Sequence, residues 1–298
     1  MLARWHLVAA PRAALFRHRT CTGTLVADEA DPGRSRSRIG TLLWELRQHR
    51  HALRVLVAMQ YRSTHRAQAL GVFWPIANPL ILTAVVSVVF GRLFPQAREG
   101  YPVFLLIGLV LWNFLSHAWL EATDCLMRYS EIVKRTELPP YLVIVATILS
   151  NGISLGFSSL GMLPLLVFYP DSFHLSAALF LLPLIVVLVC LLGLALSLAS
   201  APLNVLYRDV GYLVGSLLLM VFWLTPIVYP VEAVSDRVRG ILFLNPMTGL
   251  IECVRDIVMD GEAPPARALA LSVATTLALF VAGALTYRRF ASRIADHV

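Results

Sequence analysis

Long stretches without Asp, Glu, Lys or Arg alternate with short charged segments along this chain of 298 residues. Two of these stretches, residues 172–207 and 210–231, contain no Asp, Glu, Lys or Arg. About 20 apolar residues in a helix cross a bilayer core about 30 Å thick, so each stretch is long enough to span it. The pattern predicts six transmembrane helices, at residues 68–91, 101–120, 141–168, 177–201, 212–230 and 268–287.

Helices, and not the strands of a barrel, are the predicted form of these spans. Backbone groups in lipid must bond within the protein, and uninterrupted apolar runs differ from the alternating pattern of membrane-spanning strands. We therefore expect an all-α integral membrane protein. Because each interior proline removes a backbone donor, we expect kinked but unbroken helices at five positions. These are Pro75, Pro79, Pro164, Pro183 and Pro226.

Arg208 and Asp209 stand side by side between the two charge-free stretches. Two opposite charges belong in water, which places the pair in a turn between the fourth and fifth spans. The composition agrees with a membrane protein, since 58% of the residues are hydrophobic, 14% are charged and the mean hydropathy is +0.71.

The basic residues are distributed unevenly between the two sides of the predicted membrane. With a cytoplasmic N-terminus, 19 of the 25 Lys and Arg residues lie on the cytoplasmic side. The positive-inside rule therefore predicts that both termini are cytoplasmic. This orientation and attraction to anionic lipid headgroups account for the formal charge of +7, so no nucleic acid partner is expected.

The N-terminal residues differ from the spans and divide into two parts. Residues 1–40 are polar and charged in their second half, which predicts a flexible cytoplasmic tail. In residues 41–67, leucines recur near helical spacing between arginines, which predicts an amphipathic helix at the cytoplasmic membrane interface. The alternative is a solvated segment without a specific role. We assign residues 68–290 to the transmembrane domain and 291–298 to a cytoplasmic C-terminus.

Two loops carry helical patterns of their own. Residues 125–140 end in two prolines and predict a short cytoplasmic helix, which is either a docking element for a partner protein or an ordinary connector. Residues 241–261 have apolar positions at helical spacing but are interrupted by charges. They predict re-entrant or amphipathic periplasmic helices between spans five and six, with Asn245 before Pro246 capping or turning the chain.

Catalytic and metal-binding patterns are weak. The sequence contains no G-x-S-x-G, no H-E-x-x-H and no phosphate-binding loop, so we expect no enzyme activity, no metal and no bound cofactor on this chain. Asp124 and Glu131 are more simply explained as surface ion pairs than as a catalytic pair. His117, one helical turn from Glu121, is favoured as an interface residue over a functional one, although polar groups within spans are functional candidates.

Five segments in order resemble the membrane subunit of type-2 ABC exporters that move polysaccharides such as O antigen, capsule or teichoic acid. The segments are "LGVFWPIANPLILTAVVSVVFGRLF" at 70–94, "EIVKRTELPP" at 131–140, "LNVLYRDVGYLV" at 203–214, "WLTPIVYP" at 223–230 and "LNPMTGLIECVRDIVMDG" at 244–261. Two departures from the family pattern are Leu138 before Pro139, where an aromatic residue is common, and the first 40 residues, which extend beyond the usual start.

The resemblance implies a homodimeric permease in the bacterial inner membrane that exports a lipid-linked polysaccharide. It implies that two copies of a separate ATPase subunit bind ATP and Mg, and that a coupling helix contacts this subunit through Arg128, Glu131, Ile132, Val133, Lys134 and Arg135. It also places Arg208 and Asp209 in a cytoplasmic turn that holds two helix ends in register. The alternatives are a drug exporter of the same fold and a membrane-embedded glycosyl or lipid-transfer enzyme.

Aromatic residues in spans one, two and five are candidates for the lining of a polysaccharide path. Sugars present apolar faces that stack on rings, and a sliding polymer needs many weak contacts. The alternative is that these rings are anchors at the membrane interface. The candidates are Phe73, Trp74, Trp112, Phe114, Trp119, Phe222 and Trp223.

Overall fold

The computed structural model describes residues 49–65, 71–93, 100–136 and 138–297, which all belong to one compact unit, Leu46–Val298. The predicted tail at residues 1–40 and the first part of the predicted amphipathic helix lie outside the described residues. Within the described ranges every regular element is a helix, in agreement with the all-α prediction.

The helices follow one another with short connections. In chain order they are α2 (Arg50–His65), η1 (Gly71–Phe73), α3 (Trp74–Leu93), α4 (Tyr101–Arg128), α5 (Ser130–Thr136), α6 (Tyr141–Ser159), α7 (Met162–Phe168), η2 (Pro170–Ser172), η3 (Ala177–Leu181), α8 (Leu182–Leu206), α9 (Val210–Leu224), η4 (Val231–Ala233), α10 (Asp236–Leu242), α11 (Pro246–Arg255), the π-helical turn η5 (Asp256–Asp260) and α12 (Ala266–His297).

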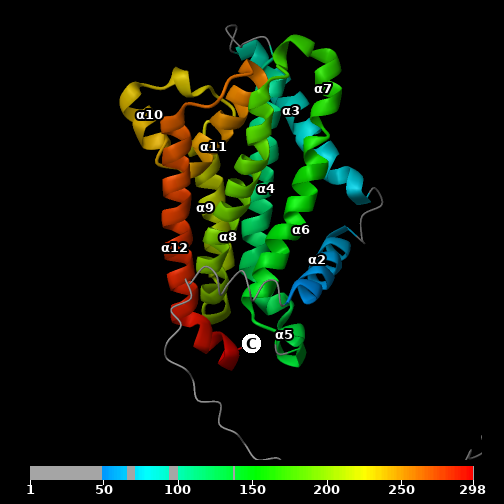
Figure 1. Cartoon of the computed structure of the whole chain (residues 1–298), viewed down its shortest axis with the longest axis vertical. Coiled ribbons are helices and arrows are strands. Elements are labelled where there is room, and N and C mark those ends of the chain that lie inside the picture. Colours follow the sequence, from blue (N-terminus) through cyan, green and yellow to red (C-terminus); the bar gives the residue numbers. More distant parts are fainter. Residues whose placement is uncertain (1–48, 66–70, 94–99, 137, 298) are drawn as a thin grey trace, which may run out of the picture. The chain divides into compact units, whose positions relative to one another are not determined.

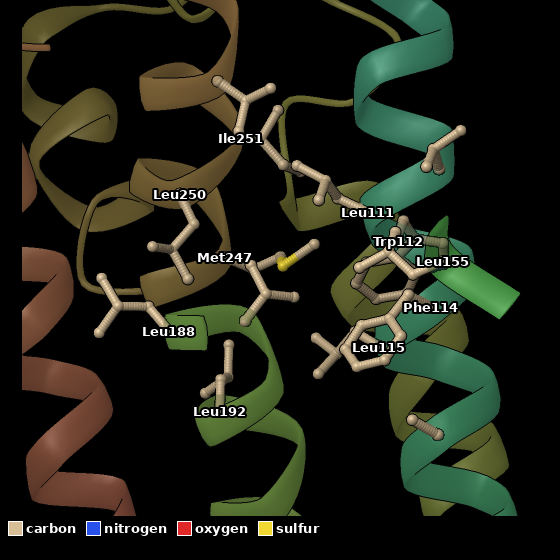
Figure 2. Close-up of a cluster of buried hydrophobic side chains, with 14 of the residues drawn as sticks. Leu111, Trp112, Phe114, Leu115, Leu155, Leu188, Leu192, Met247, Leu250 and Ile251 are labelled. Atoms are coloured by element: carbon tan, nitrogen blue, oxygen red, sulfur yellow. The ribbon is translucent and has the colours of Figure 1, made fainter. Parts of the chain in front are cut away.

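Helix α4 is the centre of the bundle and packs against α3, α6, α8, α9 and α11. Its apolar side chains are buried along most of its length, as expected for a helix enclosed by neighbours. Figure 2 shows Leu111 and Leu115 of α4 beside Met247 of α11 and Leu192 of α8. Helix α12 covers the outer side of α8 and also contacts α11.

The two ends of the bundle carry different elements (Figure 1). Helix α5 and the C-terminal end of α12 lie at one end, and α10 and α11 lie at the other. The predicted turn containing Arg208 and Asp209 connects α8 to α9. Helix α2, the described part of the predicted amphipathic helix, packs along α6 through its buried Leu56.

Four helical segments are long and apolar enough to cross a membrane, namely Tyr101–Arg128, Tyr141–Phe168, Ala177–Leu206 and Ala266–Ala291. They correspond to predicted spans two, three, four and six. Predicted spans one and five correspond to the shorter apolar helices Trp74–Val89 and Val210–Leu224. The chain is therefore a multi-pass membrane protein in its described part, and six crossings remain a prediction.

Not all the expected proline kinks occur. The third predicted span is interrupted only at Leu160 and Gly161, between α6 and α7, where both residues keep helical backbone angles. This agrees with a kink at Pro164, which has no N–H to donate to the carbonyl of Leu160. Pro183 lies in the first turn of α8, where its missing donor costs nothing. The fifth predicted span, 212–230, ends early, because α9 stops at Leu224 and Pro226 follows in a bend.

The predicted helices between spans five and six are present. Asn245 caps α11, with its side-chain oxygen accepting a hydrogen bond from the backbone N–H of Met247 at 3.1 Å. Pro246 occupies the first turn of this helix, as its fixed φ favours. The short helix predicted within residues 125–140 is also present, as α5.

Candidate functional site

A partly open cavity of about 400 Å³ lies between α3, α4 and α6, beside the end of α2. This volume is in the range of small-molecule sites in proteins. The cavity is lined by Thr64, Trp74, Pro75, Asn78, Pro79, Asn113, Phe114, His117, Glu121, Asn151, Ser154, Leu155 and Ser158. Polar side chains from helices that are otherwise apolar therefore meet in one place.

The polar residues reach the cavity because each helix carries them on one face. Asn113, His117 and Glu121 are spaced four residues apart on α4, which puts them in one row along the helix. Ser154 and Ser158 show the same spacing on α6. Polar residues in membrane helices face the bundle interior or a water-filled space, so this spacing was a signal for the cavity that the sequence interpretation did not use.

Hydrogen bonds organise part of the lining. The carboxamide nitrogen of Asn151 donates to Oε2 of Glu121 at 2.8 Å and to the carbonyl oxygen of Thr147 at 3.1 Å. The hydroxyl of Ser158 donates to the carbonyl oxygen of Pro75 at 2.8 Å, which links α6 to the start of α3. The first bond holds the Glu121 carboxylate in place at the cavity wall.

Two of the seven predicted path aromatics, Trp74 and Phe114, line this cavity. The Trp74 residue is 43% exposed, whereas Phe114 is buried. Phe73 precedes Trp74 and is exposed, and the cavity lining does not include it. The other four predicted aromatics do not line this cavity, so within the single chain the structure does not gather all seven around it.

These four aromatics make contacts of different kinds. Trp112 is buried in the core shown in Figure 2 and packs edge-on against Phe222, with ring centroids 5.6 Å apart. Phe222 in turn contacts Trp223, which is 60% exposed on α9. The indole N–H of Trp119 donates to the hydroxyl of Ser200 at 3.1 Å, which joins α4 to α8. Trp112 and Trp119 therefore have packing roles within the chain.

Helix α5 turns its apolar and charged residues in opposite directions. Ile132 is half-buried in a satellite cluster, formed by Leu56, Leu142 and Ala146 with the apolar side chains around them, and half-buried Val133 packs against the main core. The predicted coupling residues Arg128, Glu131, Lys134 and Arg135 are exposed. The free surface of α5 is therefore charged, and the two apolar residues of the predicted contact, Ile132 and Val133, pack against the rest of the chain.

Glu131 forms the surface ion pair that its sequence context predicts, with Arg135 at 3.3 Å. Asp124 forms no ion pair with a basic residue in the described ranges. Its Oδ1 accepts a hydrogen bond from the carboxamide of Asn204 at 2.8 Å. The same Asn204 accepts a hydrogen bond from the backbone N–H of Gly211 at 3.0 Å, so one buried side chain joins α4, α8 and α9.

Arg208 and Asp209 are exposed in the turn, as expected for charges between two spans. Among the described residues they form no ion pair with each other or with another side chain. Asn204 and its partners account for the fixed geometry of the turn, and the sequence interpretation did not single out this residue. Asn204 could have been identified in the sequence as a polar residue at the end of an apolar run, four positions before the charged pair.

Arg255 is the other residue whose importance was missed. Its side chain is 3% exposed and donates to the carbonyl oxygens of Pro226, Ile227 and Phe104 at 2.7, 2.9 and 3.2 Å. It also pairs with Glu252 at 2.7 Å, and its guanidinium lies 3.3 Å from the ring centroid of Phe104. Burial lowers the pKa of Arg255, while the neighbouring carboxylate of Glu252 opposes that shift.

Comparison with known protein families gives one match that covers most of the chain. Residues 51–259 match the ABC-2 type transporter family. The matched region includes the cavity, α5, the turn between α8 and α9, and α11 with Arg255.

Individual proteins are also similar to this chain, at 22 to 26% sequence identity. The chain is 26% identical over 247 residues to the O-antigen export system permease protein RfbA of Myxococcus xanthus, covering 82% of this chain and 94% of that protein. It is 22% identical over 210 residues to a protein of the same name from Klebsiella pneumoniae, covering 70% and 80%. The polysialic acid transport protein KpsM of Escherichia coli is 23% identical over 228 residues, covering 74% and 85%.

Proposed function

Because this chain belongs to the ABC-2 type transporter family, we propose that it is the permease subunit of an ATP-driven exporter of lipid-linked polysaccharide. The observation that carries the proposal is the similarity, over most of the chain, to permeases named for O-antigen export and to a polysialic acid transport protein. The substrate is of the O-antigen or capsule type, and transport runs outward across the bacterial inner membrane.

The proposed exporter needs a second kind of subunit that hydrolyses ATP. The sequence has no phosphate-binding loop, so ATP and Mg bind to two copies of a separate ATPase chain. Helix α5 is the contact that we propose for this chain. Its exposed Lys134 and Arg135 suit an acidic surface on the ATPase, while Ile132 and Val133 fix the helix to the permease.

The proposed permease is a homodimer with both termini in the cytoplasm. The orientation is supported by the excess of basic residues in the termini, in α5 and in the turn at Arg208. A dimer is supported by the resemblance of the sequence to the membrane subunit of type-2 ABC exporters, which implies a homodimeric permease.

Deleting the gene and measuring surface polysaccharide tests the proposal. We expect loss of surface glycan, accumulation of lipid-linked polymer inside the cell, recovery by the intact gene and unchanged sensitivity to antibiotics. Normal surface glycan together with increased drug sensitivity would contradict the proposal and favour a drug exporter of the same fold.

A further inference from the structure

The cavity between α3, α4 and α6 has more hydrogen-bonding capacity than the protein uses. The side chains of Asn78, Asn113 and His117 form no hydrogen bond with any residue in the described ranges. Glu121 accepts one bond through Oε2, which leaves Oε1 available to a ligand. Donors and acceptors from two helices therefore face one space without partners.

The unbonded polar groups are accessible from the open side of the cavity, since Asn78 and His117 are exposed. Accessible polar groups can exchange hydrogen bonds with water for hydrogen bonds with a ligand. The half-exposed Asn113 and Glu121 lie on α4, a helix whose other residues are largely buried and apolar. A ligand with several hydroxyls, or water in its absence, satisfies such groups.

The charge of the lining restricts the class of ligand. Among the described residues that line the cavity there is no Lys or Arg, and Glu121 is acidic. A phosphate or carboxylate ligand would lie near this carboxylate without a cation to offset the repulsion. An apolar ligand would leave the carboxamides unpaired. A neutral ligand with many hydroxyls agrees with both constraints.

The aromatic residue at the wall adds the second feature of a sugar site. Trp74 is 43% exposed on α3, so its ring is accessible beside the polar groups. Sugar rings combine hydroxyls at their edges with apolar C–H faces, and an indole is a large apolar surface for such a face. The Asn carboxamide offers one donor group and one acceptor, and the Glu carboxylate offers two acceptor oxygens, which suit neighbouring hydroxyls.

We infer that this cavity binds a neutral sugar ring, with Asn113 and Glu121 bonding its hydroxyls and Trp74 stacking on its face. The inference rests on the proposed function for its biological meaning, because it makes the cavity a subsite for the exported glycan. The binding itself is a property of the permease alone and is measurable without ATPase or transport.

Saturation-transfer NMR on the purified full chain in lipid nanodiscs tests the binding. The probes are the methyl glycosides of glucose, N-acetylglucosamine and rhamnose, with pyrophosphate as a charged competitor. We expect transfer to at least one glycoside, reduced about fivefold or more by Asn113→Leu and by Trp74→Ala, each of which removes one contact. Pyrophosphate should not compete.

Two matched variants serve as controls. Thr275→Val changes a polar residue of α12 that bonds only within its own helix, and Tyr212→Ala removes an aromatic residue that is 81% exposed on α9. Both should retain full transfer. Equal elution volumes and thermal midpoints for all variants establish that the protein is folded.

Three outcomes would overturn the inference, namely no transfer to any glycoside, equal loss in the control variants, or displacement by pyrophosphate. Surface glycan in the deletion strain is a separate readout. Loss of glycan without glycoside binding would refute the cavity site and leave the proposed export function intact. Glycoside binding with normal glycan in the deletion strain would refute the export function and leave the site intact.

Discussion

At the scale of single residues, Arg255 connects three parts of the fold. It bonds to the start of α4 at Phe104, to the bend after α9 at Pro226 and Ile227, and to Glu252 on its own helix. A buried charge is tolerated when it is paired and when its remaining donors are bonded, as they are here. The residue therefore holds α11 against the bundle.

Replacing Arg255 with Leu should destabilise the protein by about 3 to 5 kcal/mol, because it leaves the Glu252 carboxylate and three carbonyl oxygens without their partner. The expected result is a large fall in the thermal midpoint of the purified protein in detergent. Arg267→Leu, at an exposed arginine that begins α12, is the control and should change the midpoint little. Equal midpoints for the two variants would show that the Arg255 network contributes no net stability.

Asp256, the next residue, gives the protein a pH dependence. Burial, and secondarily the negative charges of Glu252 and Asp260, raise its pKa from 3.8 to about 6. The folded state therefore binds this proton more tightly than the unfolded state, so the contribution to stability is complete below pH about 4 and is lost as pH rises through about 6. Asp256→Asn should raise the thermal midpoint at pH 7, and this advantage should shrink as pH falls below 6.

The control for this pH profile is Asp236→Asn, whose carboxylate side chain is 98% exposed on α10. It should follow the wild-type profile. An Asp256→Asn variant whose midpoint stays at a constant offset from the wild type between pH 4 and 7 would contradict the assigned titration.

Apart from Glu252, three positions before it, the partners of Arg255 are backbone carbonyls up to 151 positions away. No residue type reveals such partners, so the importance of Arg255 was not predictable from local sequence. In the sequence, Arg255 is one of the charges that interrupt the apolar pattern of residues 241–261. The residues of the cavity were partly predictable. Trp74 and Phe114 were candidates, and the spacing of Asn113, His117 and Glu121 was visible in the sequence, but convergence with α6 depends on tertiary packing.

At the scale of elements, the contact between α8 and α12 depends on one glycine. A Cβ atom at Gly283 would overlap the carbonyl oxygen of Ala195 on α8, and backbone cannot move aside as a side chain can. Gly283→Ala should therefore force the helices apart and cost about 1 to 3 kcal/mol. The thermal midpoint and the yield of folded protein measure the effect.

Gly156→Ala is the matched control, since Gly156 is also helical and has open space where a Cβ would lie. Alanine favours a helix over glycine by about 1 kcal/mol, so this change should be neutral or stabilising. A Gly283→Ala protein as stable as Gly156→Ala would mean that the close contact is not needed.

Helix α5 gives a second prediction at this scale. Replacing Lys134 and Arg135 with Glu should leave the permease folded and stop co-purification of the ATPase, because the exposed charges reverse sign. Replacing Ile132 and Val133 with Asp should instead reduce folded protein, since both pack inward. Yield and bound ATPase are measured together in one pull-down.

Arg288→Glu with Arg289→Glu makes the same change in charge at exposed positions near the end of α12 and should retain the ATPase. Retention of the ATPase by the Lys134 and Arg135 variant would argue against the contact at α5.

The apolar pattern of the sequence was sufficient to locate the long helices but not to place their ends. Uninterrupted apolar runs located α4, α8 and α12 because hydrophobicity and helix length are set together by the membrane. The ends were less predictable. Proline was expected to kink each helix, but its effect depends on its position, and it lies in the first turn of α8 and beyond the end of α9.

At the scale of the whole molecule, the sequence predicted an all-helical membrane protein with its charged elements gathered at one end of the bundle. The sequence did not predict which face of α5 packs against the rest of the protein. An amphipathic pattern shows that a helix has an apolar and a charged face, but not which face is covered. In this fold α2 and α6 supply the apolar surface that Ile132 covers.

The central claim is that this permease moves a lipid-linked polysaccharide when its ATPase hydrolyses ATP. The most direct measurement reconstitutes both subunits in liposomes with radiolabelled lipid-linked polymer and follows its appearance on the opposite face, where added glycosidase or lectin distinguishes the two sides. We expect ATP-dependent transfer that requires both subunits and stops with Lys134→Glu and Arg135→Glu. Polymer that stays on its original face despite ATP hydrolysis by the assembled complex would contradict it.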